Sequence, residues 1–89
     1  ITPTGADLGK NFETAVFHSL RRAYREVYYW RGEGEVDFVT LEGNRPRPIQ
    51  VSWDGIKDRH KRAVNEFCGH HSNALEPLFV TKDNFSRVL

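Results

Sequence analysis

The sequence predicts one small α/β domain, in which helices flank a mixed sheet that contains an antiparallel three-strand meander. Two stretches repeat their apolar residues at the helical period, and three runs rich in aromatic and β-branched residues lie between them. Glycine-containing turns separate those runs. The chain has 89 residues, enough for one domain. The predicted order is therefore helix, three strands, helix, strand.

The first helix is predicted over residues 7–25. Phe12, Val16 and Leu20 fall on one face at the helical spacing, which makes that face the buried one. Glu13 lies inside the same arc, where a carboxylate is costly unless something hydrogen-bonds or coordinates it. Glu13 is therefore a candidate site residue; the alternative is a side chain that reaches solvent or pairs with an arginine.

The three strands are predicted over residues 27–31, 35–41 and 48–53. Residues 32–34 fit a tight hairpin turn, and residues 42–46 fit a looser one. Short connections of this kind join antiparallel neighbours, so the three strands are expected to form a meander.

A second helix is predicted over residues 57–72, and a short apolar strand follows over residues 78–81. A right-handed crossover through this helix lays the last strand parallel to a strand of the meander. The sheet is therefore expected to be mixed.

Polar side chains interrupt two neighbouring strands of this sheet. Strict alternation puts Asp37 on the same face as Glu35, and puts Gln50 on the same face as Ser52. A hard cation such as Mg²⁺ takes about six oxygen ligands, typically one or two carboxylates, a carbonyl and waters. The expected protein ligands are Asp37, Glu13, the side-chain carbonyl of Gln50 and the backbone carbonyl of Val51. The sequence thus predicts a Mg²⁺ or Mn²⁺ site.

The alternative is a solvated polar sheet face, with Glu35 and Arg31 as a cross-strand ion pair. A zinc site is not expected from Cys68, His70 and His71. Structural zinc takes four ligands, and His70 points away from the helix face that the other two share. The chain also lacks the glycine motifs of phosphate-binding loops, so we expect no nucleotide hydrolysis within it.

Composition and charge exclude several classes of protein. One cysteine disfavours a disulfide scaffold, and no apolar run approaches the roughly 18 residues of a membrane span. No signal-like start is present. We therefore expect a cytoplasmic protein with no membrane partner. The chain has no methionine and begins at Ile1, so we also expect a fragment of a longer protein, with residues 1–7 a linker remnant and residues 8–89 the domain.

The formal net charge is only +1, although 28% of the residues are charged, so contact with DNA would need a local basic surface. Solvated faces are the alternative interpretation of such basic groups. The candidates are Arg21, Arg22, Arg25, Arg45, Arg47, Lys57, Arg59, Lys61 and Arg62.

Three segments resemble the motifs of PD-(D/E)XK nuclease-like domains. They are Gly-Lys-Asn-Phe-Glu at residues 9–13, Glu-Val-Asp-Phe-Val at residues 35–39 and Ile-Gln-Val-Ser-Trp-Asp at residues 49–54. They resemble more closely the domain of unknown function at the C-terminal end of many archaeal and bacterial AAA-type ATPases. The resemblance implies a restriction-endonuclease-like αβββαβ core, a metal-dependent phosphodiesterase site, and an ATPase module that precedes this domain in the same chain.

Under that resemblance, Glu13 corresponds to the helix glutamate and Asp37 to the strand aspartate. Gln50 stands where the superfamily has Asp or Glu, and Ser52 stands where it has lysine. Gln50 removes one negative charge, and Ser52 cannot place a positive charge near the attacking hydroxide. Lys10, one turn before Glu13, is the leading candidate for a replacement cation, and Arg31 is the second. The alternative for Lys10 is an ordinary surface lysine.

The sequence therefore predicts the nuclease-fold domain of an ATPase, with catalysis lost or weakened, that binds nucleic acid or protein. One alternative is an active Mg²⁺- or Mn²⁺-dependent DNA endonuclease, in which Lys10 stabilises the developing charge. Another is a protein-interaction module that uses exposed aromatic residues such as Tyr28 and Trp30.

Overall fold

The computed structural model describes residues 5–89, with side chains from Leu8 onward. The elements follow the predicted order, with one short helix added at the end. They are α1 (Gly5–Ala23), β1 (Tyr28–Arg31), β2 (Glu35–Glu42), β3 (Arg45–Val51), α2 (Asp58–His70), β4 (Leu78–Val80) and α3 (Phe85–Val88). The linker expected at residues 1–7 lies partly outside the described residues, and its last three residues belong to α1 instead.

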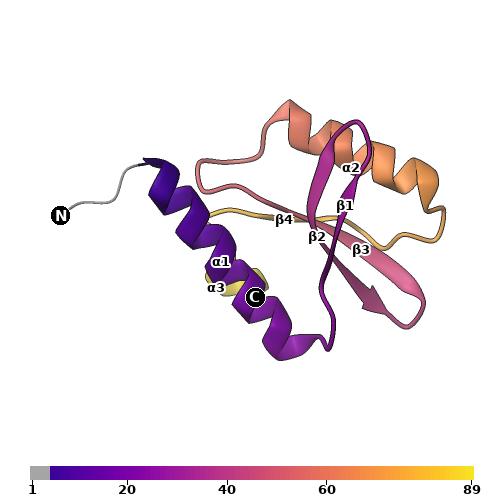
Figure 1. Cartoon of the computed structure of the whole chain (residues 1–89), viewed down its shortest axis with the longest axis horizontal. Coiled ribbons are helices and arrows are strands. Elements are labelled where there is room, and N and C mark those ends of the chain that lie inside the picture. The colour runs from indigo at the N-terminus through magenta and orange to yellow at the C-terminus, as the bar shows by residue number, and fades with distance from the viewer. Residues whose placement is uncertain (1–4) are drawn as a thin grey trace.

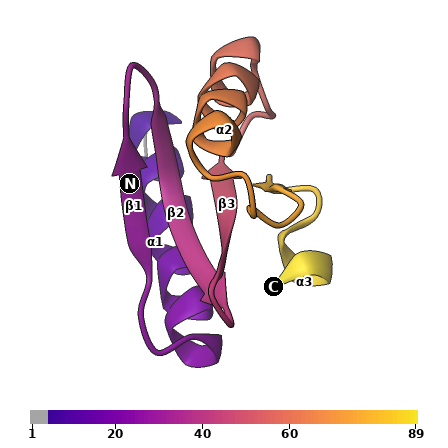
Figure 2. The ribbon, with the colours of Figure 1, turned by 90° about the vertical axis from the view of Figure 1, so that its right-hand side faces the viewer.

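The four strands form one mixed sheet in the order β1-β2-β3-β4 (Figure 1). β1 and β2 are antiparallel, as are β2 and β3, whereas β4 returns through α2 to lie parallel to β3. α1 packs on one face of the sheet and α2 on the other (Figure 2). The α/β class, the meander and the mixed sheet flanked by helices are therefore confirmed.

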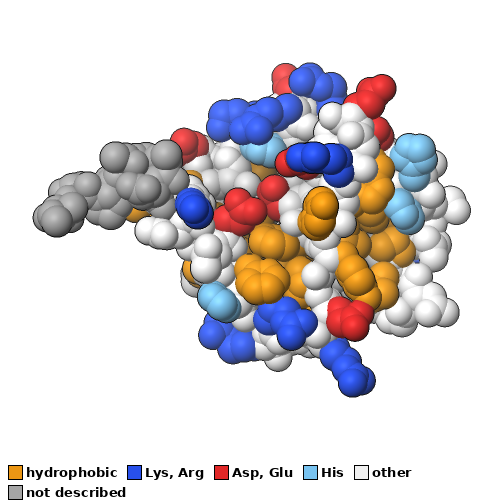
Figure 3. Space-filling view, in the orientation of Figure 1, with side chains coloured by type: hydrophobic (Ala, Val, Ile, Leu, Met, Phe, Trp, Pro, Cys, Tyr) orange, Lys and Arg blue, Asp and Glu red, His pale blue; other side chains and the backbone are white. Residues whose placement is uncertain are grey.

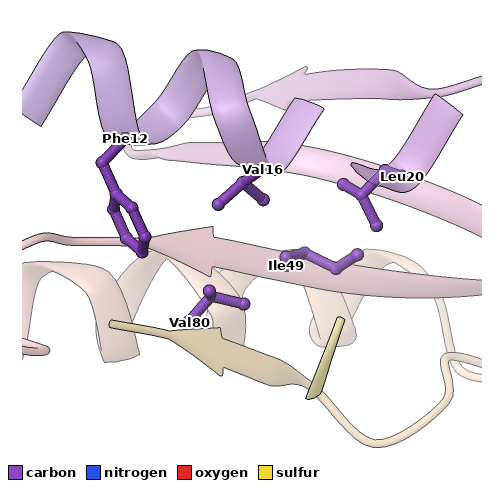
Figure 4. Close-up of a cluster of buried hydrophobic side chains, with 5 residues drawn as sticks. All are labelled: Phe12, Val16, Leu20, Ile49 and Val80. Carbon is purple, nitrogen blue, oxygen red and sulfur yellow. The ribbon is translucent and has the colours of Figure 1, made fainter. Parts of the chain in front are cut away.

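The α1 face carries the first core cluster. Phe12, Val16 and Leu20 are buried at the predicted helical spacing, and they meet Ile49 of β3 and Val80 of β4 (Figure 4). Burying an aliphatic or aromatic side chain of this size contributes about 1.5–3 kcal/mol. This cluster therefore ties the first helix to the last two strands, which lie far from it in sequence.

The α2 face carries the second cluster, in which Val36 and Val39 of β2 pack against Ala63 and Phe67 of α2. Trp30 of β1 closes it with an edge-on contact to Phe67, the ring centroids lying 5.5 Å apart. Each helix thus has its own apolar partner on the sheet.

The two hairpin turns differ from the sequence expectation in one respect. The second turn is the tight one, because β3 begins at Arg45 and only Gly43 and Asn44 connect it to β2. Gly43 has a φ of 65°, which a glycine adopts without steric cost. In the first turn, Glu66 of α2 accepts hydrogen bonds from the backbone N–H groups of Glu33 and Gly34 at 2.9 and 3.0 Å. That turn is thereby held against α2.

β2 contains one more residue than β1 over the same length. Tyr28 pairs with Val39 and Trp30 with Val36, so three steps along β2 match two along β1. A bulge of this kind breaks the alternation of side chains. The alternation predicted for β2 is therefore wrong between Val36 and Val39, because both enter the same cluster.

The short helix α3 was not predicted, since its four residues carry no periodic signal. Phe85 of α3 contacts Phe12 edge-on, with ring centroids 5.3 Å apart, so burial rather than propensity places it. No helix in the described part of the chain is long and apolar enough to cross a membrane.

Candidate functional site

A cavity of about 570 Å³ opens where β2 begins and β3 ends, close to the N-terminal parts of α1 and α2. Its lining is mostly polar. Strand residues that line it include Glu35, Asp37, Gln50 and Val51, and helix or loop residues include Gly9, Glu13, Glu33, Ser52, Asp54, Lys57, Arg59 and His60. The cavity therefore collects most of the predicted site residues from segments that are far apart in sequence.

Asp37 lies at the point where the backbone ladder between β2 and β3 stops. The last paired residues are Phe38 and Ile49, and beyond them the Asp37 carboxylate replaces the missing bond. Its Oδ2 accepts a hydrogen bond from the Val51 N–H at 2.8 Å. Within the described part of the chain, Oδ1 accepts no hydrogen bond. One oxygen of Asp37 is thus structural, and the other is available to the cavity that it lines.

Gln50 makes the reciprocal contact, from its side chain on β3 to the backbone of β2. Its Oε1 accepts from the Asp37 N–H at 3.1 Å, and its Nε2 donates to the carbonyls of Glu35 and His60 at 2.8 and 3.2 Å. Only this orientation of the amide satisfies all three partners, because two are acceptors and one is a donor. Gln50 is 1% exposed. The side-chain carbonyl expected to bind a metal is therefore engaged in joining β2, β3 and α2.

The pKa of Asp37 is raised to about 6, because burial disfavours the charged form and the carboxylates of Glu13 and Glu35 repel it. The hydrogen bond from Val51 and the positive charge of Arg59 act in the opposite direction. A carboxyl group in a cleft whose pKa is raised to this degree is typical of a functional site. Asp37 is therefore charged at pH 7, at a cost to the folded state.

Glu13 and Lys10 are both exposed, and they differ in where they lie. Glu13 lines the cavity and acts on Asp37 through its charge, so the structure brings these two carboxylates together. It borders the core rather than lying within it, which corrects the buried position predicted for it. Lys10 does not line the cavity; it lines an adjoining hollow beside Phe17 and Phe38, and Glu13 lines both.

Ser52 and Val51 also line the cavity, just beyond the paired part of β3. The Ser52 N–H donates to the carbonyl of Val80 at 2.9 Å, which extends the parallel pairing with β4 by one residue. The Ser52 side chain brings no charge to the cavity. The side of the site that carries lysine in the resemblance is thus neutral.

The positive charges come from the N-terminal end of α2, which sequence reasoning did not assign to the site. Lys57 and Arg59 line the cavity, and the charge of Arg59 acts on Asp37. His60 is buried beside them, and its Nδ1 accepts from the Lys57 N–H at 2.9 Å. Burial and these two cations lower the pKa of His60, so its ring is neutral at pH 7 with the proton on Nε2. The sequence feature that could have indicated this contribution is the basic run over residues 57–62, shortly after the third strand.

Arg31, beside the first hairpin, forms an ion pair with Glu35. This is the pair expected under the alternative of a solvated polar sheet face. The Nε of Arg31 lies 2.8 Å from a carboxylate oxygen of Glu35. Both side chains are largely exposed, so the pair contributes little to stability.

Comparison with known protein families shows the family of the chain. Residues 8–87 match the family described as Domain of unknown function (DUF4143). The chain belongs to this family. The match covers every residue that lines the cavity, and it assigns no activity to them. The comparisons with curated proteins and with solved structures found no match.

All four residues predicted to supply oxygen ligands, Glu13, Asp37, Gln50 and Val51, line the cavity of this DUF4143 domain. The described residues contain no group of three or more His, Cys, Asp and Glu side chains arranged to hold a metal ion. Asp37 Oδ1 and the carboxylate of Glu13 nevertheless share the cavity, and two carboxylates with several waters suit Mg²⁺ or Mn²⁺. These two carboxylates therefore fit a hard divalent ion that is held mainly by water.

Proposed function

We propose that this DUF4143 domain keeps a nuclease-like core whose hydrolytic activity is lost or strongly weakened, and that it acts by binding nucleic acid or protein. In this proposal it is the C-terminal part of a cytoplasmic ATPase, and the ATPase module supplies any nucleotide hydrolysis. The restriction-endonuclease-like assignment of the core belongs to the same proposal.

The observation that carries the proposal is the role of Gln50. In a nuclease-like site this position supplies a carboxylate to the metal, whereas here its amide bridges three backbone groups. A glutamate could not make the same contacts, because a carboxylate would face the carbonyls of Glu35 and His60. The proposal therefore assigns Gln50 a structural role in place of the role of a metal ligand.

The charge balance of the cavity supports the same conclusion. Five acidic residues line it, and position 52 carries no lysine, so a phosphate group would meet net negative charge beside the reacting position. They are Glu13, Glu33, Glu35, Asp37 and Asp54. Lys57 and Arg59 offset part of this charge from the opposite wall. Efficient hydrolysis needs a positive group beside the attacking oxygen, and Ser52 is not one.

The test is a cleavage assay with Mn²⁺ on labelled single-stranded and duplex DNA, with Asp37→Asn as the matched variant. We expect intact DNA with the wild-type chain and with the variant, and calorimetry shows whether Mn²⁺ binds at all. Cleavage by the wild-type chain that disappears in Asp37→Asn would overturn the proposal.

A second candidate, a metal-dependent DNA endonuclease, is favoured by the cavity that Glu13, Asp37 and Arg59 share. A bound Mg²⁺ or Mn²⁺ would supply an activated water and neutralise charge on the phosphate. Asp37 and Glu13 would hold the ion, and Arg59 would stand in for the missing lysine. In that case Arg59→Gln would lose cleavage in the same assay, whereas Lys10→Gln, outside the cavity, would keep it.

A further inference from the structure

The N-terminal end of α2 contributes one side of the cavity, and this side differs in charge from the rest. Lys57, Arg59 and His60 line the cavity, whereas Asp58 between them does not. We call these three lining residues the basic wall. Figure 3 shows basic side chains over the start of α2, above acidic side chains that lie between α2 and α1. The charges around the cavity are thus separated by sign.

His60 is the buried member of the basic wall, and its ring has an unused donor. The hydrogen bond from the Lys57 N–H to Nδ1, at 2.9 Å, fixes the proton of the neutral ring on Nε2. Nε2 has no partner among the described residues, although His60 is only 8% exposed. In that part of the chain, Thr40 Oγ1 is the one fully buried side-chain polar atom without a partner, so Nε2 reaches solvent. His60 lines the cavity, and its Nε2–H therefore opens to that space.

The unused donor is held in position from β3. Gln50 donates from its Nε2 to the His60 carbonyl at 3.2 Å, while its Oε1 accepts from the Asp37 N–H. The amide that closes the gap between β2 and β3 thus also fixes the first turn of α2. A donor that is already ordered loses little freedom when a ligand binds.

The start of α2 also lacks a side-chain cap. The N-cap residue is Lys57, whose ammonium group has no acceptor and makes no capping hydrogen bond. The backbone N–H groups of His60 and Lys61 return to the Lys57 carbonyl, but those of Asp58 and Arg59 have no partner among the described residues. Free N–H groups and the helix dipole favour an anion at this end of a helix. An anion in the cavity would therefore meet backbone as well as side-chain donors.

The two cations of the basic wall are available to such an anion. Among the described residues, neither Lys57 nor Arg59 forms an ion pair, although five carboxylates line the same cavity. One of the five, Glu35, is already paired with Arg31. Carboxylates that are not in contact with the wall act on a ligand through water and salt, which screen them, whereas direct contact with the donors is not screened.

A terminal phosphate group matches these donors better than an internal phosphodiester. A phosphate monoester carries a charge of about −1.5 to −2 at pH 7, which the two cations balance. An internal diester brings further phosphates on both sides, and these would approach acidic residues such as Glu13 and Asp37. Trp53, which is half-buried, lines the same cavity and offers a ring to a terminal base, a surface that a phosphorylated peptide does not require.

We propose that the basic wall binds the terminal phosphate monoester of a nucleic-acid strand, with the Nε2–H of His60 and the charged groups of Lys57 and Arg59 as donors. The inference rests on the proposed function and specifies how the domain binds nucleic acid without cutting it. The phosphate is held at the start of α2, and its binding needs no metal ion at Glu13 and Asp37.

The test measures fluorescence anisotropy of labelled single-stranded oligonucleotides in EDTA, with a phosphate at the 5′ end, at the 3′ end or at neither. We expect a phosphorylated strand to bind more tightly, and the preferred end identifies the source of the phosphate. Lys57→Gln and Arg59→Gln should each weaken its binding about tenfold, as the loss of one charge-assisted hydrogen bond does. Lys61→Gln and Arg62→Gln are the matched controls, since both residues are exposed on α2 and neither lines the cavity. Both controls should bind as the wild-type chain does.

Two further variants separate the buried donor from the acidic residues. His60→Gln keeps an amide that can donate, so it should bind the phosphorylated strand more tightly than His60→Leu, which has no donor. Circular dichroism checks that both are folded, and the exposed Lys57 and Arg59 decide the test if they are not. Asp37→Asn removes a negative charge from the cavity and should tighten binding roughly twofold to threefold.

Equal affinity for phosphorylated and hydroxyl-ended strands would overturn the inference and keep nucleic-acid binding as the proposed function. Binding that requires Mn²⁺ and disappears in Asp37→Asn would also overturn it, because a metal ion would then hold the phosphate. An equal affinity for a phosphoserine peptide would overturn the assignment to nucleic acid. No binding of any oligonucleotide would overturn the inference without touching the loss of hydrolysis, which the cleavage assay tests separately.

Discussion

The two ends of the β2–β3 hairpin are held together in different ways. From Phe38 and Ile49 to the turn at Gly43 and Asn44, the backbones pair directly, residue against residue. Beyond Phe38 the side chains of Asp37 and Gln50 take over, each bonding the backbone of the other strand. Where strands stop pairing, polar side chains close the gap, and their remaining polar atoms face the space that opens.

The polar side chains of the two ends should therefore respond to substitution in opposite directions. At the cavity end each buried polar atom has a backbone partner, so its removal leaves that partner unsatisfied. At the turn end the backbone satisfies itself, and a buried polar side chain is superfluous. Thr40 is such a residue, since it is buried and its hydroxyl has no partner in the described part of the chain.

The largest effect is expected for Gln50→Leu. Leucine keeps similar volume but leaves the Asp37 N–H and the carbonyls of Glu35 and His60 without partners. A buried group left in this state costs about 1–3 kcal/mol, and two of these three hydrogen bonds are only part-buried, so their cost lies at the low end. The free energy of unfolding should therefore fall by about 3–5 kcal/mol. Urea denaturation of the variant and of the wild-type chain measures this change in the free energy of unfolding.

Gln50→Glu serves as the matched variant for that experiment. It keeps the shape of the side chain, and its carboxylate is repelled by the two carbonyls that Nε2 now contacts. Its stability should therefore recover partly at low pH, where the protonated acid can donate one hydrogen bond. A glutamate variant as stable as the wild-type chain at pH 7 would show that the amide contacts do not determine the cavity end.

A smaller effect is expected for Asp37→Asn, and it depends on pH. Burial raises the pKa of Asp37 from 3.8 to about 6, so the folded state holds a proton that the unfolded state releases. Stability from this group is present below pH 3.8 and is lost as the pH rises toward 6 and above. Asparagine has no such loss, and its carbonyl oxygen still accepts from the Val51 N–H.

The stability of Asp37→Asn relative to the wild-type chain should therefore rise by about 2 kcal/mol between pH 4 and pH 7.5, after allowance for the partly exposed position of the group. Urea denaturation at both pH values gives the difference. Parallel pH profiles for the two chains would show that Asp37 titrates normally and that the cavity end does not strain its charge.

The order of the elements and most of their bounds could be predicted, because periodicity reports which residues are buried and burial decides the packing. Phe12, Val16 and Leu20 are an example, since their spacing identified the face of α1 that covers the sheet. The helix α3 could not be predicted, because Phe85 is positioned by contact with Phe12, which is remote in sequence.

For the site, the sequence identified Glu13 and Asp37, and the structure places both at one cavity. It could not show the bulge in β2, which arises from the register of two strands, nor the engagement of Gln50, which depends on three backbone groups in space. Linear spacing favours Lys10 as the replacement cation, because Lys10 lies one turn from Glu13 along the helix. Arg59 reaches the same cavity from another element, and linear spacing does not report such a contact.

The smallest effect, and the one with opposite sign, is expected for Thr40→Val at the turn end. Valine has nearly the same shape, so the change removes an unpartnered hydroxyl and leaves the packing intact. The free energy of unfolding should rise by about 1 kcal/mol, measured by urea denaturation at pH 7. Thr40→Ser is the control, because it keeps the hydroxyl and loses the methyl group, and it should be less stable than the wild-type chain by about 1 kcal/mol. A loss of stability in Thr40→Val would mean that the hydroxyl has a partner after all, and that polar side chains hold both ends of the hairpin together.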